Sequence, residues 1–503
     1  MLNLKGFAIR EFMKWRSSQV RDFSIHSCTQ QHQILLDLVQ SASKTVFGKE
    51  HNFSEIKNYQ DFKSAVPILE YDELKKYFER TLHGEQNVIW SENIYWFAKS
   101  SGTTSDSSKF IPVSKSTLDS GHYKGAFDVM SQFCLNKPNT NVFNGKTLVV
   151  SGSQKRHPEN QRVRVGDVSS ILVYNQPSLA DFLRTPAKSI SLIEDFEDKL
   201  EIVSKKSIAE NVTGIAGVPT WNIVLLQKIL AETGKNHIGE IWPEMELYIH
   251  GGVNFEPHRA MFEKLVPLEQ MEYLQVYNAS EGFFAFQDRL GADDMLLATN
   301  HGVFYEFIHI DQVNDAQPEI FSIDEVQTGQ QYALVISTNS GLWRYKIGDT
   351  ILVTSTQPFR IKVTGRTKFF INAFGEELMV DNTDQAILKA SEATKSIVRN
   401  YTAGPKYFDE SGKGAHEWMI EFAQAPLDLK EFVLILDEQL RKLNSDYDAK
   451  RSKDLALTLP IVHSAPQGLF YKWLKSKNKI GAQNKVPTLS NHRVILEELL
   501  EII

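Results

Sequence analysis

Several features are scarce in this sequence, and each scarcity argues against a class of protein. Cysteine occurs only at Cys28 and Cys134, so neither a disulfide framework nor a structural zinc site is expected. No apolar run reaches the roughly eighteen residues of a membrane-spanning helix, and residues 1–10 lack the apolar core of a signal peptide. Positive charge is not in excess, since the net charge is −7, which argues against a general nucleic-acid-binding protein. We therefore expect a cytoplasmic protein with neither nucleic-acid nor membrane partners.

A loop rich in hydroxyl groups lies between two strand-like segments near residue 100. Its hydroxyl donors are Ser100, Ser101, Thr103, Thr104 and Ser105. Gly102 lets the backbone bend toward a ligand, consecutive N–H groups in such a loop can form an anion-binding nest, and Lys109 adds a point charge. A Walker A loop is excluded, because no second glycine is followed by Lys-Ser or Lys-Thr. The loop therefore predicts polyphosphate binding; a flexible linker is the alternative, although it would not need strand-like flanks.

The spacing of apolar residues predicts both helices and strands in this 503-residue sequence. Helical spacing occurs at 33–42, 71–78, 118–133, 221–231, 258–265, 386–398 and 427–443. Strand-like runs occur at 146–153, 212–219, 245–252, 272–277, 302–310, 331–338, 350–354 and 417–422. The charged residues 446–454 are interpreted as a solvated connection.

Three parts of the chain differ in how these elements alternate. Residues 1–90 are mainly helical and are interpreted as scaffold. Strands and helices then alternate, which predicts a mostly parallel α/β sheet with ligands beyond the carboxyl ends of its strands. Closely spaced strands over about 295–363 predict a small antiparallel β subdomain, either a sheet or a small barrel. We therefore expect an α/β fold, with a large N-terminal domain at 1–365 and a smaller α+β domain at 366–503.

The segment Tyr277-Asn-Ala-Ser-Glu281 follows a predicted strand, at the end of which the site residues of an α/β sheet collect. A carboxylate such as Glu281 suits Mg²⁺, a hard cation that binds one or two carboxylates together with phosphate oxygens. The ring of Tyr277 could stack on a nucleotide base. The alternative is structural, with Ser280 forming the N-cap of a helix.

The segment from Gly341 to Asp349 is dense in functional groups. Its nine residues, Gly-Leu-Trp-Arg-Tyr-Lys-Ile-Gly-Asp, include two glycines, two aromatic residues, two cations and an aspartate. An aspartate that follows a glycine at a turn between strands can accept two hydrogen bonds from the vicinal hydroxyls of a ribose. A plain hairpin turn at Gly348-Asp349 is the alternative.

Together these clusters contain the residue types that adenylation of a carboxylic acid requires. A carboxylate is a poor electrophile, and its activation takes attack on the α-phosphate of ATP, with Mg²⁺ and cations spreading the charge of the transition state. The sequence offers a phosphate loop, a carboxylate for the metal at Glu281 and a ribose acceptor at Asp349. It also offers a late lysine, Lys485, in a loop that begins at Gly481. In isolation that lysine would be interpreted as a solvated surface group.

In their order along the chain, these motifs resemble those of the GH3 acyl-acid amido synthetases, within the adenylate-forming superfamily that includes acyl-CoA synthetases and luciferase. Ser100-Ser-Gly-Thr-Thr104 is similar to the family's phosphate motif, and Tyr277 to Glu281 is similar to its Tyr-x-x-Ser-Glu motif. Phe304-Tyr-Glu-Phe307 resembles its Tyr-Phe-Glu-Phe segment, and Gly341 to Asp349 resembles Gly-Leu-Tyr-Arg-Tyr-Arg-Val-Gly-Asp. Order and spacing match from Ile94 to Arg366, and more weakly beyond.

The resemblance implies an ATP- and Mg²⁺-dependent ligase with a mobile C-terminal domain, acting as a monomer or weak dimer. The implied catalytic residues are Lys485 and Glu281, of which Glu281 also binds the metal. The implied nucleotide-binding residues are Ser100, Ser101, Gly102, Thr103, Thr104, Lys109, Tyr277, Asn278, Ser280, Asp349 and Arg366. Candidates for the acyl pocket are Trp221, Phe283 and Phe284, with core packing as the alternative for each.

Two departures from the family pattern leave the acceptor open. Ser105-Asp106 stand where many relatives carry further glycines, and the segments Gly365 to Lys368 and Asn372 to Glu376 look closer to the hinge of the wider superfamily than to the plant enzymes. The second departure favours a non-plant, bacterial-type member. The favoured hypothesis is a ligase that joins a small carboxylic acid to an amino acid; the alternatives are an acyl-CoA ligase and a nucleotide-binding protein without turnover. Candidate cations for either acceptor are Arg344, Lys346, Arg360 and Lys362.

Overall fold

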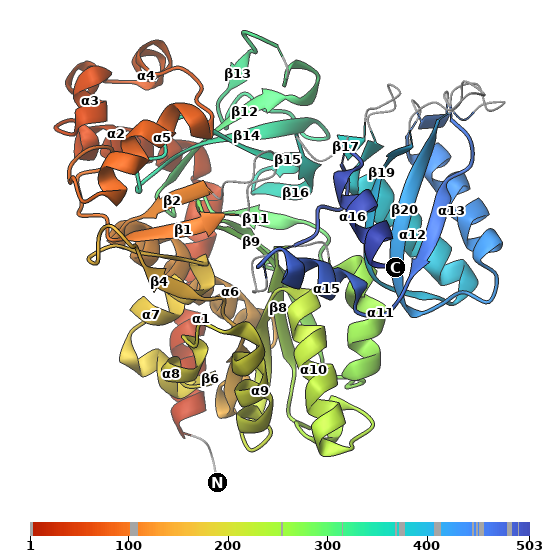
Figure 1. Ribbon diagram of the computed structural model, residues 1–503. Helices are drawn as coiled ribbons and strands as arrows, with labels where there is room; N and C mark the ends of the chain where they lie inside the picture. Colours follow the sequence, from red (N-terminus) through yellow and green to blue (C-terminus); the bar gives the residue numbers. More distant parts are fainter. Residues whose placement is uncertain are drawn as a thin grey trace. The chain divides into compact units, whose positions relative to one another are not determined.

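The computed structural model divides the chain into two compact units (Figure 1). The described residues are 4–100, 109–252, 255–313, 315–367, 370–371, 378–406, 414–444, 447–448, 451, 457–479, 485–490 and 492–503. The first unit contains residues 1–252 and 268–363, and the second contains residues 253–267 and 364–503. The second unit therefore includes a short segment from the middle of the sequence. Helix α11 (Glu256–Leu265) in this segment confirms the helix predicted at 258–265, but its place in the second unit was not predicted.

The N-terminal part of the first unit is helical, as predicted. Its helices are α1 (Leu4–Ile25), α2 (Ser27–Ala42), α3 (Val46–Glu50), α4 (Tyr59–Ala65) and α5 (Tyr71–Leu82). Local capping explains where three of them begin. The side chain of Thr45 accepts a hydrogen bond from the Gly48 N–H before α3, Asn58 accepts one from the Asp61 N–H before α4, and Glu70 opens a capping box at α5.

A small sheet carries the hydroxyl-rich loop. Its strands, in order, are β2 (Lys109–Val113), β1 (Trp96–Ser100), β5 (Arg164–Gly166) and β4 (Gln154–Arg156). The predicted strand-like flanks of the loop are confirmed as β1 and β2, which pair antiparallel. The helix predicted at 118–133 is also present, but it starts as a π-helix, η2 (Thr117–Tyr123), before continuing as α6 (Lys124–Asn136).

A twelve-stranded sheet forms the centre of the first unit (Figure 1). Its strands, in order, are β13 (Ile320–Phe321), β12 (Val303–His309), β14 (Gln331–Thr338), β15 (Tyr345–Thr356), β16 (Phe359–Arg366), β11 (Met295–Leu297), β10 (Gly282–Phe286), β9 (Glu272–Ala279), β8 (Leu247–Gly251), β7 (Val212–Gly217), β3 (Lys146–Val149) and β6 (Arg184–Thr185). Strands β6, β3, β7, β8 and β9 pair in parallel. Antiparallel pairing begins at β9–β10 and includes β10–β11, β11–β16, β14–β15, β12–β14 and β12–β13. The predicted parallel and antiparallel regions are therefore confirmed, and they share one continuous sheet.

Helices lie between the parallel strands along the chain. They are α7 (Val168–Asn175), α8 (Lys188–Ser191), α9 (Phe196–Ser207) and α10 (Pro219–Thr233). Helix α10 begins with Pro219 and is followed by Gly234 at φ +66°, which matches the preference for proline at the start of a helix and for glycine just beyond its end. Short 3₁₀ turns occur at η1 (Phe53–Glu55), η3 (Val142–Asn144), η4 (Ser178–Leu183), η5 (Ile238–Glu240) and η6 (Ile310–Gln312).

The second unit has the predicted α+β pattern. Its sheet has the order β19 (Ile397–Lys406), β20 (Ala415–Gln424) and β21 (Ile461–Ala465), and a separate pair joins β17 (Phe370–Ile371) to β18 (Leu378–Met379). Its helices, besides α11, are α12 (Val380–Thr394), α13 (Leu429–Leu443), α15 (Leu469–Ser476) and α16 (Val494–Ile502). Helices α12 and α13 pack against each other, and α11 and α16 contact β19.

Two local predictions in the second unit are wrong. The helix predicted at 386–398 ends at Thr394, because Lys395 adopts a left-handed conformation at φ +52° and Ile397 begins β19. The stretch 446–454 is not simply a solvated connection, because Arg451 is buried and its Nε lies 2.7 Å from Oδ1 of Asp437. Within the ranges that the structure describes, none of the helices is both long and apolar enough to cross a membrane.

Candidate functional site

The hydroxyl-rich loop connects the two strands of a β-hairpin. Strands β1 and β2 pair as far as Ser100 and Lys109, so the chain leaves and re-enters the sheet at one point. Four of the predicted phosphate-binding residues lie outside the described residues: Ser101, Gly102, Thr103 and Thr104. Of Ser100, only the backbone is described. The residues on both sides of the loop are therefore held in one sheet.

Lys109 lies against two tyrosine rings at the start of β2. Its Nζ lies 3.3 Å from the hydroxyl of Tyr345, and 5.4 Å and 5.9 Å from the ring centroids of Tyr71 and Tyr345. A cation is attracted to the negative face of an aromatic ring at such distances. Because Tyr345 belongs to the segment from Gly341 to Asp349, this contact joins that segment to the end of the hydroxyl-rich loop.

A group of hydroxyl and amide side chains joins the end of β2 to the two residues that precede Gly341. The group consists of Ser114, Thr117, Ser120, Asn339 and Ser340. The hydroxyl of Thr117 donates to Oδ1 of Asn339 at 2.6 Å, and the hydroxyl of Ser114 donates to the Asn339 backbone carbonyl at 2.6 Å. Because buried polar groups are stable only when hydrogen-bonded, this network holds the end of β2 against the turn before Gly341.

The segment from Tyr277 to Glu281 forms a turn of a β-hairpin. Strands β9 and β10 pair antiparallel, with Ala279 opposite Gly282, and Ser280 and Glu281 make the turn between them. The alternative of a helix N-cap at Ser280 is therefore wrong, because a strand follows. The side chain of Glu281 is only 7% exposed. A carboxylate so buried is costly unless it faces a cation or hydrogen-bond donors.

Asp349 lies inside strand β15, at a β-bulge. The ladder pairs Lys346 with Val335 and Thr350 with Ala333, so Ile347, Gly348 and Asp349 stand opposite one residue of β14. Gly348 has φ +89°, a conformation that glycine adopts readily. The alternative of a hairpin turn at Gly348-Asp349 is therefore wrong. Bulges redirect side chains and are frequent beside active sites.

Tyr277 and Asp349 meet, although 72 residues separate them. The hydroxyl of Tyr277 donates to Oδ2 of Asp349, and both residues are buried, with 9% and 8% of their surface exposed. The ring of Tyr277 packs edge-to-face on Phe284, with 4.9 Å between the centroids. The structure thus brings together the side chains predicted to contact the base and the ribose of a nucleotide.

Two other residues of the segment from Gly341 to Asp349 belong to the core. Trp343 is fully buried in the main apolar cluster. Arg344 is buried and forms a forked ion pair with Glu306, with Nε–Oε2 and Nη2–Oε1 distances of 2.9 Å and 2.8 Å. Its Nη1 also donates to the Val66 carbonyl at 2.6 Å. Arg344 is therefore a buried structural cation. Its partner, Glu306, is the carboxylate within the segment from Phe304 to Phe307.

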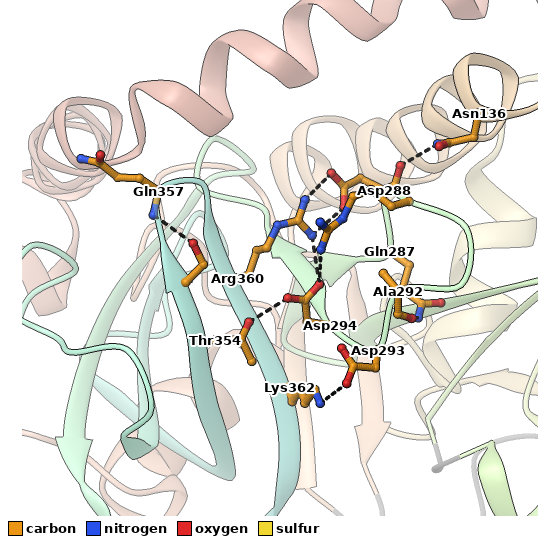
Figure 2. A network of polar contacts seen from close by, with 12 residues as sticks. Asn136, Gln287, Asp288, Ala292, Asp293, Asp294, Thr354, Gln357, Arg360 and Lys362 are labelled. Atoms are coloured by element: carbon orange, nitrogen blue, oxygen red, sulfur yellow. Dashed lines mark hydrogen bonds and ion pairs between the residues drawn. The ribbon is translucent and has the colours of Figure 1, made fainter.

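The other candidate cations for the acceptor also have partners, as Figure 2 shows for Arg360 and Lys362. Arg360 binds Asp288 at 2.9 Å and 2.7 Å, and Asp294 at 3.1 Å. Lys362 pairs with Asp293. The Nζ of Lys346 donates to the Val313 carbonyl at 2.6 Å. Arg360 thus fastens the chain between β10 and β11 to strand β16.

The three candidates for an acyl pocket do not share one environment. Phe283 packs in the cluster of α1 and α6, whereas Phe284 packs in the main cluster with Tyr277. Phe283 and Phe284 are adjacent on strand β10, where successive side chains point to opposite faces of the sheet. Trp221 is buried on α10 and belongs to neither of these two clusters.

A buried group of titratable side chains beside the Tyr277–Glu281 turn escaped the sequence analysis. The ring nitrogen Nδ1 of His122 lies 2.7 Å from Oδ1 of Asn278. His301 lies nearby, with Nε2 3.1 Å from Oδ2 of Asp128, and Arg16 donates to Oδ1 of Asp128 at 2.8 Å. Burial lowers the pKa values of both histidines. No pattern in the sequence indicates these contacts, because a single histidine in a helical segment does not show which distant residues it will contact.

The remaining predicted residues lie in the second unit. Lys485 is exposed, and it starts a segment in which Pro487 accepts a hydrogen bond from the Thr402 hydroxyl at 2.6 Å, while Leu489 bridges to Ala403. Arg366 ends strand β16. Residues 368–369, 372–377 and 480–484, which include most of the hinge-like and glycine-started segments, lie outside the described residues. Among the residues described, no group of three or more His, Cys, Asp or Glu side chains is arranged to hold a metal ion.

Comparisons with known proteins cover nearly the whole chain. The GH3 family N-terminal domain matches residues 16–271, the GH3 family central domain matches 296–366, and the GH3 family C-terminal domain matches 381–494.

Similar proteins include two from Arabidopsis thaliana. One is indole-3-acetic acid-amido synthetase GH3.3, 21% identical over 93% of this chain and 90% of that protein. The other is 4-substituted benzoates-glutamate ligase GH3.12, 21% identical over 67% of this chain and 68% of that protein.

Two solved structures share the fold. GH3.15 acyl acid amido synthetase has a TM-score of 0.79 at 17% identity, over 97% of this chain and 96% of that one. A 2-hydroxyisobutyryl-CoA ligase has a TM-score of 0.57 at 13% identity, over 97% of this chain and 91% of that one. The predicted adenylate-forming architecture is therefore confirmed.

Proposed function

Because this chain belongs to the GH3 family, we propose that it is an ATP-dependent acyl-acid amido synthetase. A carboxylate oxygen of a small acid attacks the α-phosphorus of ATP, and the bond to pyrophosphate breaks, which leaves an acyl adenylate. The amino nitrogen of an amino acid then attacks the acyl carbon and loses a proton, and AMP departs as the amide forms. The cytoplasm is the location that we propose.

One observation carries this proposal: three sequence segments with nucleotide-binding chemistry meet in the first unit. Tyr277 donates to Asp349, and Lys109 at the end of the hydroxyl-rich loop contacts Tyr345. The segments are far apart in the sequence, so their meeting is a property of the fold and not of local composition. The amido synthetase and glutamate ligase names of the relatives support the acid and amine substrates.

The residue types of these three segments suit ATP and Mg²⁺. We assign Ser100 to Thr104 and Lys109 to the phosphates, Asp349 to the ribose hydroxyls and Tyr277 to the base. A carboxylate has about four acceptor positions, so Asp349 can accept hydrogen bonds in addition to the one from Tyr277. Glu281 supplies a buried carboxylate in a hairpin turn, and a carboxylate is a ligand that Mg²⁺ prefers. Bound Mg²⁺ would neutralise charge on the phosphates.

We assign Lys485 to the adenylation step itself. A lysine that stabilises charge developing at the α-phosphorus accelerates the reaction without contributing to ground-state binding. Its position supports this assignment, because Lys485 is exposed on a segment anchored to β19 by Thr402 and Ala403. We also propose that the C-terminal domain rotates about the chain near Arg366 and so brings Lys485 to the reacting phosphate.

The amine acceptor is proposed in preference to coenzyme A. The family assignment favours it, whereas the likeness to the CoA ligase concerns the fold alone. Of the candidate cations, Arg344 and Arg360 are held in buried carboxylate pairs. Either residue would have to give up such a pair to bind the phosphates of coenzyme A or the carboxylate of an amino acid, so we assign neither to the acceptor.

The test of the proposal is acid-dependent exchange of pyrophosphate into ATP, measured over a panel of small carboxylic acids. Wild-type protein should catalyse the exchange with at least one acid, and Asp349→Asn should not. Asp293→Asn is the matched control, because this aspartate lies at the surface of the same unit in a pair with Lys362. Absence of exchange with every acid, or equal loss in the two variants, would contradict the proposal.

A further inference from the structure

His122 is a buried side chain beside the Tyr277–Glu281 turn, and the proposed reaction does not yet use it. It lies in the π-helix η2 and is 3% exposed. One ring nitrogen, Nδ1, is held by Asn278 at 2.7 Å. The other, Nε2, is buried and finds no hydrogen-bond partner among the residues that the structure describes. π-Helical turns are frequent at functional sites, where they displace a side chain from ordinary helical spacing.

The imidazole of His122 is neutral near pH 7, because burial lowers its pKa to about 4. A neutral imidazole carries one N–H and one lone pair. If Nδ1–H donates to Oδ1 of Asn278, Nε2 is an acceptor; if the amide of Asn278 is turned and donates to Nδ1, Nε2–H is a donor. In both cases one polar atom of the ring is left to pair with something else, since buried polar atoms are rarely left unsatisfied.

His122 lies on η2, which contacts strand β10, and β10 carries Phe283. Gly125, on the next turn of the helix, packs so closely on the Phe283 ring that an added Cβ would lie 2.4 Å from it. The Phe283 ring stacks on His301, with 5.8 Å between centroids. The charges of Asp128 and Arg16 are paired with each other at 2.8 Å. Because Nε2 is buried, a charged ligand group against it would be costly, whereas a neutral polar group that hydrogen-bonds to it would not.

We propose that His122 uses Nε2 to recognise a hydroxyl group on the acyl acid, so that the preferred substrates are hydroxylated carboxylic acids. A hydroxyl both donates and accepts, so it pairs with Nε2 in either tautomer of the ring. This inference rests on the proposed function, because an acid activated beside the Tyr277–Glu281 turn is what would bring a hydroxyl to His122.

The test uses two variants that separate the two nitrogens of the ring. His122→Asn places an amide where Nδ1 was, so it can keep the contact with Asn278, but it has nothing at the position of Nε2. His122→Gln places its amide near the position of Nε2 and gives up the contact with Asn278. Pyrophosphate exchange is measured with pairs of acids that differ by one hydroxyl, such as phenylacetate with the hydroxyphenylacetates and hexanoate with the hydroxyhexanoates.

Wild-type protein should show a kcat/KM roughly tenfold or more higher for the hydroxylated member of at least one pair. His122→Asn should bring that ratio close to one, and His122→Gln should retain more of it. The KM for ATP should be unchanged in His122→Asn, because this variant can keep the contact with Asn278. A purely structural role, in which His122 only supports Asn278, predicts that His122→Gln is the more impaired variant.

Three results would overturn the inference. The first is turnover by wild-type protein with no preference for any hydroxylated acid, a result that leaves the proposed function standing. The second is an equal ratio in wild type and His122→Asn, and the third is a change in the KM for ATP without a change in the ratio. Failure of every acid to support exchange in wild-type protein would instead refute the proposed function, and this inference with it.

Discussion

The buried ion pair of Arg344 and Glu306 predicts that Arg344 stabilises the fold, although it lies in the segment from Gly341 to Asp349 that also contains the candidate ligand-binding residues. Arg344→Met removes the guanidinium but keeps an unbranched apolar chain. Glu306 is fully buried, so the variant leaves its carboxylate with the 2.9 Å hydrogen bond from Tyr59 but without its cation. Breaking a buried ion pair on one side typically costs about 3–5 kcal/mol. We therefore expect the free energy of unfolding of the first unit to fall by about that amount.

Urea unfolding, followed by tryptophan fluorescence, measures this loss, and the buried Trp343 of the first unit contributes to the signal. The matched control is Arg80→Met, since Arg80 makes the same forked contact with Glu85, at 2.8 Å and 2.6 Å, on an exposed surface. An exposed pair is screened by water and contributes little, so the control should unfold like wild type. A double variant, Glu306→Gln with Arg344→Met, should recover part of the loss because no buried charge remains. Equal stability of Arg344→Met and Arg80→Met would refute the interpretation of Arg344 as a structural residue.

Three further substitutions test the assigned roles in catalysis. Asp349→Asn should weaken ATP binding by calorimetry, because a hydrogen bond to a charged group contributes about 1.5–3 kcal/mol; an unchanged Kd would reject the ribose assignment. Glu281→Gln should slow adenylation at low magnesium and recover at least partly at high magnesium, and wild-type activity at low magnesium would reject the metal assignment. Lys485→Ala should abolish pyrophosphate exchange while ATP binding stays nearly normal, and exchange at the wild-type rate would reject Lys485 as the catalytic lysine.

The frame of the candidate site was predictable because it depends on local patterns. Apolar runs on both sides of the hydroxyl-rich loop predicted strands, and β1 and β2 are those strands. Pro219 predicted the start of α10 for a similar reason, since proline restricts the backbone locally. The residues that determine such features lie within a few positions of them in the sequence.

Contacts between distant segments were not predictable, because they depend on strand register. Arg344 had the sequence features of a ligand-binding cation, yet its partner Glu306 lies on β12, 38 residues away. The bulge that places Asp349 inside β15 arises from a mismatch with β14, which is not visible in β15 alone. His122 was missed for the same reason, since its burial and its contact with Asn278 arise only when η2 packs beside β9.

Identification of the acylated product tests the central claim most directly. The reaction contains the protein, ATP, magnesium and an acid that supports pyrophosphate exchange, with either pooled amino acids or coenzyme A as the acceptor, and mass spectrometry identifies the products. We expect an amide of the acid with at least one amino acid, formed together with AMP and pyrophosphate and absent from reactions with Lys485→Ala. An acyl-coenzyme A product, with no amide from any amino acid, would contradict the claim that this chain is an amido synthetase.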